Sequence, residues 1–397
     1  MEKVYLRPRR EDSILRFHPW VFSGAIAQVT RNPAEGDLVG VYSSEGEYLA
    51  TGHYQIGSIA VRILSFDEDP LAPDFWEKMV RRAFQMRVNY GLHGSASTNC
   101  YRLIHGEGDG LPGLIIDYYD GVCVLQAHSV GMFKAKGAIC EALKAVYGDT
   151  LKAVYDKSSG TAPFKAGLDL VDGYLYRAPG FEADETVVLE NGNKFHVNWN
   201  EGQKTGFFLD QRENRAAVGR LAKARSVLNL FCYTGGFSIY ALAGGAAHVD
   251  SVDSSKKAME MVDRNVALNG FAPDMHTSYC ADAIEFLRDV PEGKYDLMIV
   301  DPPAFAKHRG ALKNALRAYQ RLNAAAIAKV APGGFVFTFS CSQVVDKEAF
   351  ALAVFSAAAQ TGRSVRILDR LNQPADHSVN IYHPEGEYLK GLLLYVE

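Results

Sequence analysis

The sequence predicts an α/β protein in three parts, in which an N-terminal β-barrel and an α+β middle domain precede a C-terminal doubly wound sheet. Three observations lead to this prediction. A chain of 397 residues is too long for one ordinary hydrophobic core. The first 70 residues consist of short apolar runs between turn sequences. From about residue 226 onward, apolar strands alternate with helices of period 3.6, which is typical of a parallel, doubly wound sheet.

The N-terminal domain (1–70) and the middle domain (71–182) are predicted from local patterns. Apolar and β-branched runs between turn sequences predict strands at 26–29, 38–42, 48–51 and 59–64. The middle domain is expected to contain a helix at 73–90 and then a strand–strand–helix–strand unit at 114–118, 122–127, 133–147 and 153–156.

The C-terminal domain (183–397) begins with a hairpin signal, the sequence Glu-Asn-Gly-Asn at 190–193 between two apolar runs. Later strands of the doubly wound sheet are predicted at 227–231, 248–253, 297–300, 335–339 and 365–368. Sheets of this kind bind ligands beyond the carboxyl ends of their strands. The residues that follow these strands are therefore the candidates for a functional site.

Composition and charge exclude several classes of protein. The net charge of −4 excludes a generally basic nucleic-acid coat protein, so RNA contact would need local basic patches. No run of 18 uncharged apolar residues occurs, and the charged N-terminus lacks the apolar stretch of a secretory signal. Six cysteines without a CxxC pair predict neither a disulfide framework nor a metal site. We therefore expect a cytoplasmic protein without a membrane partner.

Small residues and a carboxylate follow the first two strands of the predicted sheet. Gly235 and Gly236 lie between a strand and a helix, where they allow a tight turn and close approach to a ligand. The N–H groups that begin this helix could bind a carboxylate or phosphate. Asp253 ends the next strand, where a carboxylate could bridge two ribose hydroxyls. An ordinary capped strand–helix turn is the alternative explanation of the glycine pair.

Three further groups follow the remaining strands at the same predicted edge. Asp282-Ala283 follows the apparent third strand, in a place where an adenine edge could be read. Asp301-Pro302-Pro303 ends a buried strand, although prolines would also serve simply to terminate it. Cys341 follows the strand at 335–339 and lies between two serines. Four of these groups, the glycine turn, Asp253, Asp301 and Cys341, lie at neighbouring strand ends and together predict a ligand cleft.

The order of the glycine turn, Asp253, Asp282 and Asp301-Pro302-Pro303 resembles that of the class I S-adenosylmethionine-dependent methyltransferases. More specific strings resemble the RlmI family of bacterial large-subunit ribosomal RNA cytosine-C5 methyltransferases. These strings are spread over nearly the whole chain, at 18–24, 106–113, 204–212, 229–236, 339–342 and 383–391.

The resemblance implies an N-terminal PUA-type RNA-binding domain and a middle domain that joins it to a Rossmann-like methyltransferase sheet. It also implies S-adenosyl-L-methionine as the cofactor. The residues expected to bind this cofactor are Asp210, Gln211, Arg212, Asn229, Phe231, Tyr233, Thr234, Gly235, Gly236, Asp253, Ser254, Asp282, Ala283, Asp301, Pro302 and Pro303. For the segment 204–212, a salt-bridged connection between domains is the alternative.

By resemblance, Cys341 occupies the position of the family's catalytic cysteine. A thiolate that adds to carbon 6 of cytosine breaks the conjugation of the ring and makes carbon 5 nucleophilic. Asp301 could hold N3 and the exocyclic amine of the base. Glu385 or Asp376 could remove the carbon-5 proton, although both could equally be surface-loop carboxylates. Ala304 stands where many such enzymes carry a second cysteine, so release by a second cysteine is not supported.

Arginines near the N-terminus and on the basic helix are the predicted RNA contacts, because guanidinium groups pair with phosphate bidentately. They are Arg7, Arg9, Arg10, Arg16 and Arg82, the last within a basic stretch that includes Lys78, Arg81, Arg87 and Arg102. Solvated helix faces would explain the same charges. The implied partner is large-subunit ribosomal RNA, whose target base would have to swing out of its stack. A homodimer is left open.

Two other functions are also open. The same scaffold could methylate another base, such as guanine N7, and Cys341 would then be structural. A non-catalytic RNA-binding protein could retain the sheet, but the intact glycine turn with Asp253, Asp282 and Asp301 argues against it. A dinucleotide oxidoreductase is disfavoured, because the full G-x-G-x-x-G pattern is absent after Phe231. The cysteines at 100, 123, 140 and 280 are expected to be small buried hydrophobic residues.

Overall fold

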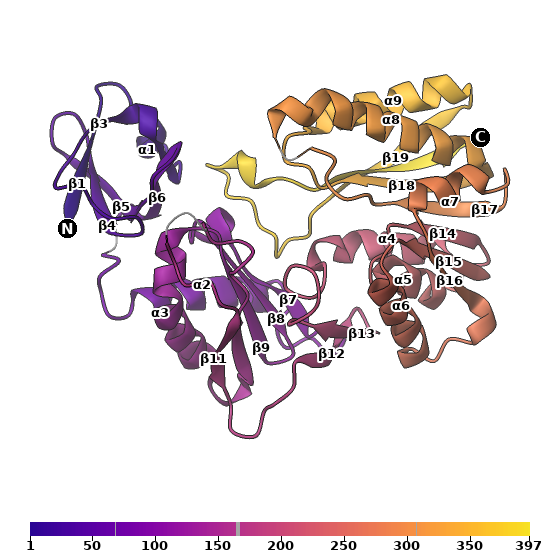
Figure 1. The fold of residues 1–397 in the computed structure, drawn as a ribbon, viewed down its shortest axis with the longest axis horizontal. Coiled ribbons are helices and arrows are strands. Elements are labelled where there is room, and N and C mark those ends of the chain that lie inside the picture. Colours follow the sequence, from indigo (N-terminus) through magenta and orange to yellow (C-terminus); the bar gives the residue numbers. More distant parts are fainter. Residues whose placement is uncertain (68, 164–166, 307) are drawn as a thin grey trace. The chain divides into compact units, whose positions relative to one another are not determined.

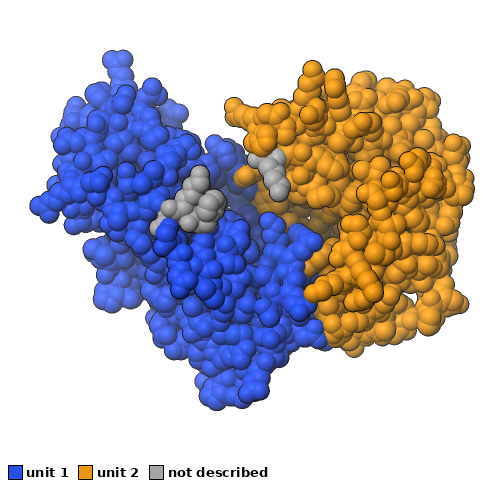
Figure 2. All heavy atoms as spheres, viewed as in Figure 1, with its two compact units in different colours: residues 1–188, 197–209, 375–386 blue, residues 189–196, 210–374, 387–397 orange. Residues whose placement is uncertain are grey.

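The computed structural model describes residues 1–67, 69–163, 167–306 and 308–397. The chain divides into two compact units (Figure 2). Unit 1 comprises residues 1–188, 197–209 and 375–386, and unit 2 comprises residues 189–196, 210–374 and 387–397. Every helix among the described residues is too short or too polar to span a lipid bilayer.

Unit 1 begins with a six-stranded sheet of order β2-β6-β5-β4-β1-β3, in which only β1 and β4 pair in parallel (Figure 1). Alternate residues face its core, as Val4 and Leu6 do in the first strand, because successive side chains of a strand point to opposite faces. Its elements are β1 (Glu2–Leu6), α1 (Asp12–Leu15), β2 (Trp20–Phe22), β3 (Ile26–Val29), β4 (Leu38–Tyr42), β5 (Tyr48–Tyr54) and β6 (Ile59–Ser65). The predicted strand-rich N-terminal part is confirmed, with β1, β2 and the short helix α1 as additional elements.

The rest of unit 1 is built on a five-stranded sheet of order β11-β10-β9-β8-β7. Two helices pack against each other beside it, and α2 buries Phe75, Met79 and Ala83 at helical spacing. The predicted strand–strand–helix–strand unit is present, but β7 and β11 extend it at its two ends. The elements are α2 (Phe75–Asn89), β7 (Cys100–His105), β8 (Leu114–Tyr119), β9 (Val122–Ala127), α3 (Val130–Tyr147), β10 (Ala153–Asp156) and β11 (Gly173–Arg177).

Unit 2 contains a seven-stranded sheet of order β16-β15-β14-β17-β18-β20-β19. Pairing is parallel from β16 to β18, as predicted, and β20, which was not predicted, runs antiparallel to both β18 and β19. The strands are β14 (Ser226–Leu230), β15 (His248–Asp253), β16 (His276–Cys280), β17 (Tyr295–Val300), β18 (Val330–Ser340), β19 (Val365–Asn372) and β20 (Lys390–Val396). The hairpin β12 (Glu185–Glu190) and β13 (Asn193–Asn198), predicted from its turn sequence, precedes this sheet in the chain.

Helices cover both faces of this sheet, which confirms the doubly wound architecture (Figure 1). One face carries α4 (Arg212–Leu221), α5 (Gly236–Ala243) and α6 (Lys256–Leu268). The other carries α7 (Ala283–Asp289), α8 (Leu312–Lys329) and α9 (Lys347–Thr361). Sandwiched between them, the central strands β14 and β17 are almost wholly buried, and their buried residues are apolar or aromatic apart from Asn229, as is typical of parallel strands covered on both faces.

A buried ion pair stabilises unit 2 where the hairpin meets α4. The Arg215 guanidinium donates to both carboxylate oxygens of Glu190, at 2.8 Å each, and Tyr240 Oη donates to the same carboxylate at 3.0 Å. The Glu190 side chain is fully buried and that of Arg215 is 3% exposed. Removing one partner would leave a charge buried and unpaired, which is far more costly than losing a surface ion pair.

We therefore expect the substitution E190Q to lower the free energy of unfolding by about 3 kcal/mol. The matched control is E260Q, whose ion pair with Lys256 spans 4.0 Å on an exposed helix face and should contribute less than about 1 kcal/mol. Urea denaturation of the full-length chain, followed by circular dichroism, measures both. Equal unfolding midpoints for the two variants would contradict the assignment.

Candidate active site

The turn that connects β14 to α5 has a constrained backbone. The φ angles of Phe231, Tyr233 and Gly235 are 58°, 48° and 79°, all in the left-handed region that non-glycine residues seldom adopt. A Cβ atom at Gly235 would lie 3.0 Å from the side chain of Val262, so glycine is needed for space as well as for conformation. Strained turns of this kind are concentrated at functional sites. The α5 helix begins directly after it, at Gly236.

Asp253, at the end of β15, holds this turn in place. Its Oδ2 accepts a hydrogen bond of 3.0 Å from the backbone N–H of Tyr233, and its Oδ1 accepts one of 2.9 Å from Ser255. The neighbouring Ser254 is exposed. Asn229 is fully buried and donates to Ser238 Oγ at 2.8 Å, so its side-chain amide links β14 to α5. The glycine turn and Asp253 are thus in direct contact, as their strand-end positions predicted.

Asp282 has a structural partner that the sequence reasoning did not anticipate. Its Oδ1 accepts hydrogen bonds of 2.9 Å from the N–H groups of Ile284 and Glu285, which makes it the N-cap of α7. Ala283 is buried at the start of the same helix. The predicted role of this dipeptide in reading an adenine edge stays a prediction, and it would have to use groups other than the capping Oδ1.

The segment 210–212 lies beside the end of β17. Gln211 Nε2 donates to Asp301 Oδ2 at 3.0 Å, and Asp210 Oδ2 accepts from the hydroxyl of Tyr388 at 2.7 Å. Asp210 Oδ1 is buried and has no hydrogen-bond partner among the described residues. Arg212 is buried as well. Tyr388, absent from the predicted site residues, could have been found because it belongs to the string at 383–391.

Asp301 directly follows β17 and is flanked by the buried ring of Pro302 and the exposed ring of Pro303. Burial and the negative charge of Asp210 raise the pKa of its carboxyl group from 3.8 to about 7. The hydrogen bond from Gln211 opposes this shift only in part. Near neutral pH, Asp301 is therefore present in both its protonated and its ionised form.

Cys341 is the first residue after β18, the strand that pairs in parallel with β17. It is half-buried, whereas the cysteines at 100, 123, 140 and 232 are buried. Burial, followed by the negative charges of Asp301 and Asp210, raises the pKa of the Cys341 thiol to about 12. Cys280 is exposed, which corrects the expectation that it is a buried hydrophobic residue.

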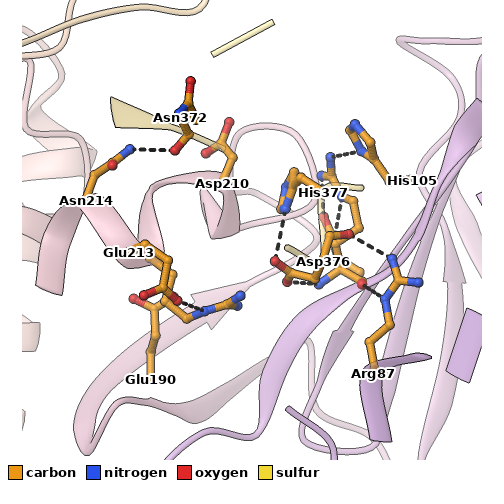
Figure 3. A network of polar contacts seen from close by, with 12 residues as sticks. Arg87, His105, Glu190, Asp210, Glu213, Asn214, Asn372, Asp376 and His377 are labelled. Carbon is orange, nitrogen blue, oxygen red and sulfur yellow. Dashed lines mark hydrogen bonds and ion pairs between the residues drawn. The ribbon is translucent and has the colours of Figure 1, made fainter. Parts of the chain in front are cut away.

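The two candidate proton acceptors, Glu385 and Asp376, belong to unit 1, whereas Cys341 and Asp301 belong to unit 2. Asp376 is fully buried, its Oδ2 accepts from the backbone N–H of Arg102 at 2.9 Å, and its backbone oxygen accepts from Arg87 at 2.8 Å (Figure 3). These contacts anchor the segment 375–386 within unit 1. The alternative that Asp376 is a surface-loop carboxylate is therefore wrong, and its role as the proton acceptor stays a prediction.

Glu385 is about half exposed, and its two carboxylate oxygens each lie 3.9 Å from a histidine Nε2, one from His18 and one from His383. Among the described residues, these three side chains form the group whose ligand atoms, within 4.8 Å of one another, could hold a metal ion. Glu385 as the proton acceptor stays a prediction.

The predicted RNA contacts divide into exposed and buried arginines. Arg7, Arg9, Arg10, Arg16 and Arg82 are exposed, and Arg9 and Arg10 line a hollow of about 380 Å³ together with Phe22. In contrast, Arg87 is fully buried against Asp109, and Arg102 donates to Asp117 at 2.8 Å. These two members of the basic stretch are structural ion-pair partners, which sequence charge alone could not reveal.

Comparisons with known proteins identify the class. Residues 102–393 match the family model described as S-adenosylmethionine-dependent methyltransferase, and residues 4–66 match that of a PUA-like domain. The solved structure of SMU.776 in complex with SAH is 24% identical and superposes with a TM-score of 0.85 over 100% of both chains, so the fold is the same. The protein is an S-adenosylmethionine-dependent methyltransferase with an N-terminal PUA-like domain.

Curated relatives show to which family of methyltransferases the chain belongs. The proteins named ribosomal RNA large subunit methyltransferase I from Pseudoalteromonas translucida and Pseudoalteromonas atlantica are 40% and 41% identical over 395 and 403 residues. The one from Aeromonas hydrophila is 39% identical, and in each case 98% of both chains is covered. The chain belongs to the ribosomal RNA large subunit methyltransferase I family.

The raised pKa of Asp301 predicts a specific pH dependence of stability. Between pH 4 and 7 the unfolded chain ionises this carboxyl group while the folded protein keeps it protonated, so rising pH destabilises the fold across this window. Relative to D301N, the wild-type free energy of unfolding should fall by roughly 2–4 kcal/mol from pH 4 to pH 7 and then level off. The exposed Asp289, substituted as D289N, serves as the control. Denaturation curves at several pH values measure the difference, and parallel pH profiles for D301N and wild type would disprove the shift.

Proposed function

We propose that this methyltransferase modifies carbon 5 of a cytosine in large-subunit ribosomal RNA, with Cys341 as a covalent nucleophile. The observation that carries the proposal is the position of a half-buried thiol and an acid, Cys341 and Asp301, directly after the adjacent parallel strands β18 and β17. The names of relatives about 40% identical to this chain support ribosomal RNA as the substrate.

The residues at the same edge fit S-adenosyl-L-methionine. Asp210 has a buried oxygen, and Thr234 a buried hydroxyl, without a partner among the described residues. We assign Asp210 to the cationic methionine end, the turn at Gly235 to close backbone approach, and Asp253 to the ribose. When bound, this cofactor supplies an electrophilic methyl group on a sulfonium. The predicted contributions of the other cofactor-binding residues are part of the same proposal.

Cys341 and Asp301 have complementary tasks in this mechanism. The Cys341 thiolate adds to carbon 6, which breaks the conjugation of the ring and raises the electron density at carbon 5. The pKa of about 7 suits Asp301 to the cytosine edge, because a protonated carboxyl group donates to N3 while its other oxygen accepts from the exocyclic amine. After methylation a base removes the carbon-5 proton, and the electrons of that C–H bond re-form the C5–C6 double bond and expel the Cys341 thiolate from carbon 6. Glu385 stays the candidate for this base.

We assign RNA binding to the exposed arginines of the PUA-like domain. Arg9 and Arg10 flank a hollow that also contains Phe22, whose side chain is 45% exposed. Guanidinium groups beside an exposed aromatic ring suit a nucleic-acid strand, because the cations pair with phosphate and the ring can stack on a base. Arg7 and Arg16 are exposed and lie close to Arg9 and Arg10 in the sequence, and Arg82 is exposed on α2. These three arginines would extend the contact with RNA.

The competing function is methylation of another base, such as guanine N7, without a covalent intermediate. Replacement of Cys341 separates the two. C341A should lose at least about a thousandfold of methyl transfer to large-subunit ribosomal RNA prepared from cells lacking this protein, while its affinity for S-adenosylmethionine changes little. C280A, which removes the exposed cysteine at the end of β16, should keep full activity.

The readout is the transfer of a radiolabelled methyl group, with the affinity for the donor measured by titration calorimetry. Retention of methyl transfer by C341A would exclude the covalent mechanism. Mapping the modified base as 5-methylcytosine would in turn exclude guanine N7.

The double substitution R9A/R10A should weaken binding of ribosomal RNA. Loss of two phosphate contacts should also lower the slope of log affinity against log salt concentration by about 1.4, since each contact to a single strand contributes about 0.7. R288A, at an arginine that is 71% exposed in unit 2, is the control and should leave both quantities unchanged. Fluorescence anisotropy with a labelled RNA fragment measures them, and an unaltered salt slope in R9A/R10A would refute the assignment.

A further inference from the structure

Lys390 is a buried lysine beside the candidate nucleophile. It begins β20, where it pairs directly with Ser340, the last residue of β18 and the neighbour of Cys341. Lys390 is only 6% exposed. Lysine is rarely buried unless its ammonium group is paired, yet among the described residues no carboxylate lies within 4.0 Å of this one. A buried cation in such a place calls for a physical explanation.

The ammonium group of Lys390 is held by the turn that follows Cys341. Its Nζ donates to the backbone oxygens of Ser342, at 2.6 Å, and Val345, at 2.5 Å. The turn is closed by a 3.2 Å hydrogen bond from the N–H of Val345 to the same Ser342 oxygen, and Ser342 Oγ donates to Ala306 at 2.6 Å. The position of Cys341 at the start of this turn therefore depends on Lys390.

The charges around the two groups are arranged asymmetrically. Cys341 faces the carboxyl groups of Asp301 and Asp210, which disfavour a thiolate, and Lys390 is the cation that opposes them. The charged groups that face Lys390 are those of Asp346, Glu387 and Lys347. Glu387 and Lys347 pair with each other at 2.5 Å, and Asp346 caps α9 by accepting from Ala349 at 2.7 Å. The negative charge of a Cys341 thiolate would in turn raise the pKa of Lys390.

We propose that Lys390 is a positioning residue for Cys341. The ammonium group of Lys390 fixes the turn after the cysteine, and its positive charge stabilises the Cys341 thiolate. This inference rests on the proposed function of Cys341 and extends it. Burial lowers the pKa of Lys390 to about 8. Its positive charge is therefore present below about pH 8 and is lost above it, so the stabilisation of the thiolate should fade across that pH.

The test measures the reactivity of individual thiols towards iodoacetamide in the full-length protein, with each cysteine quantified by peptide mass spectrometry. Alkylation needs the thiolate, because the thiol first loses its proton to solvent and the resulting thiolate then attacks the reagent's carbon and displaces iodide. K390M removes the charge and both hydrogen bonds, and K390R keeps a charge. K329M is the matched control, because Lys329 also donates to a backbone oxygen, that of Val290, but lies just before β18, at the other end of that strand from Cys341.

At pH 7.5, K390M should alkylate Cys341 about tenfold more slowly than wild type, which corresponds to an upward thiol shift of about one pKa unit. K390R should recover most of the rate, and K329M should match wild type. The exposed Cys280 should react equally in all four proteins, which shows that the reagent and the fold are unaffected. Wild-type reactivity of Cys341 in K390M, or a K390R rate as low as that of K390M, would overturn the proposal.

A second measurement keeps the proposal testable if K390M fails to fold. The variant D301N retains Lys390 but lacks the carboxyl group that ionises near pH 7. In D301N the log rate of Cys341 alkylation should rise by less than one unit per pH unit around pH 8, because Lys390 loses its charge across this pH. A slope of one throughout would refute the role of the lysine charge. Because alkylation requires neither methyl donor nor RNA, its outcome is independent of whether C341A loses methyl transfer.

In steady-state methylation, K390M should lower kcat about tenfold with little change in KM for RNA. If the lysine had a structural role alone, its replacement would lower thermal stability without lowering kcat selectively over KM. K329M provides that comparison. Equal losses of activity in K390M and K329M would contradict a specific effect on Cys341.

Discussion

Parallel pairing among β15, β14, β17 and β18 is the constraint on which the candidate active site depends. Because these strands run in the same direction, the backbone leaves each of them at one edge of the sheet. The glycine turn, Asp253, Asp301 and Cys341 are far apart in the chain and reach this edge only through that pairing. Lys390 reaches the same edge because it is the first residue of β20. This strand runs antiparallel to β18, so β20 begins beside the residue at which β18 ends.

The electrostatics of this edge follow from partial burial of like charges. Burial and the negative charge of Asp210 raise the pKa of Asp301, and the two carboxylates together make a thiolate at Cys341 unfavourable. A negatively charged, partly desolvated edge favours a cationic ligand, which is the charge type of a sulfonium methyl donor. On the proposed mechanism, the nucleophile is therefore activated by positive charge brought close to it, from the donor and from Lys390, and an unliganded protein keeps the thiol protonated.

Much of the local structure could be predicted because it depends on neighbouring residues. The strands at 26–29, 38–42, 122–127, 153–156 and 248–253 agree with prediction, since β-branched runs between turn residues are a local signal. The strands β1 and β7 carry charged side chains that hide this signal. Asp282 was predicted from its strand-end position, but its capping hydrogen bonds show that a carboxylate in such a place can serve the helix that follows it.

The sequence by itself determined the alternation of strands and helices, the glycine turn and the residues at each strand end, because periodicity and turn chemistry act over a few residues. Only the tertiary structure decided which charges are buried and with which partners. Arg87 and Asp376 are 289 positions apart and Asp210 and Tyr388 are 178 apart, yet each pair is joined by a hydrogen bond. Such contacts depend on how strands pair and where the chain returns, and no local pattern encodes the partner at the far end.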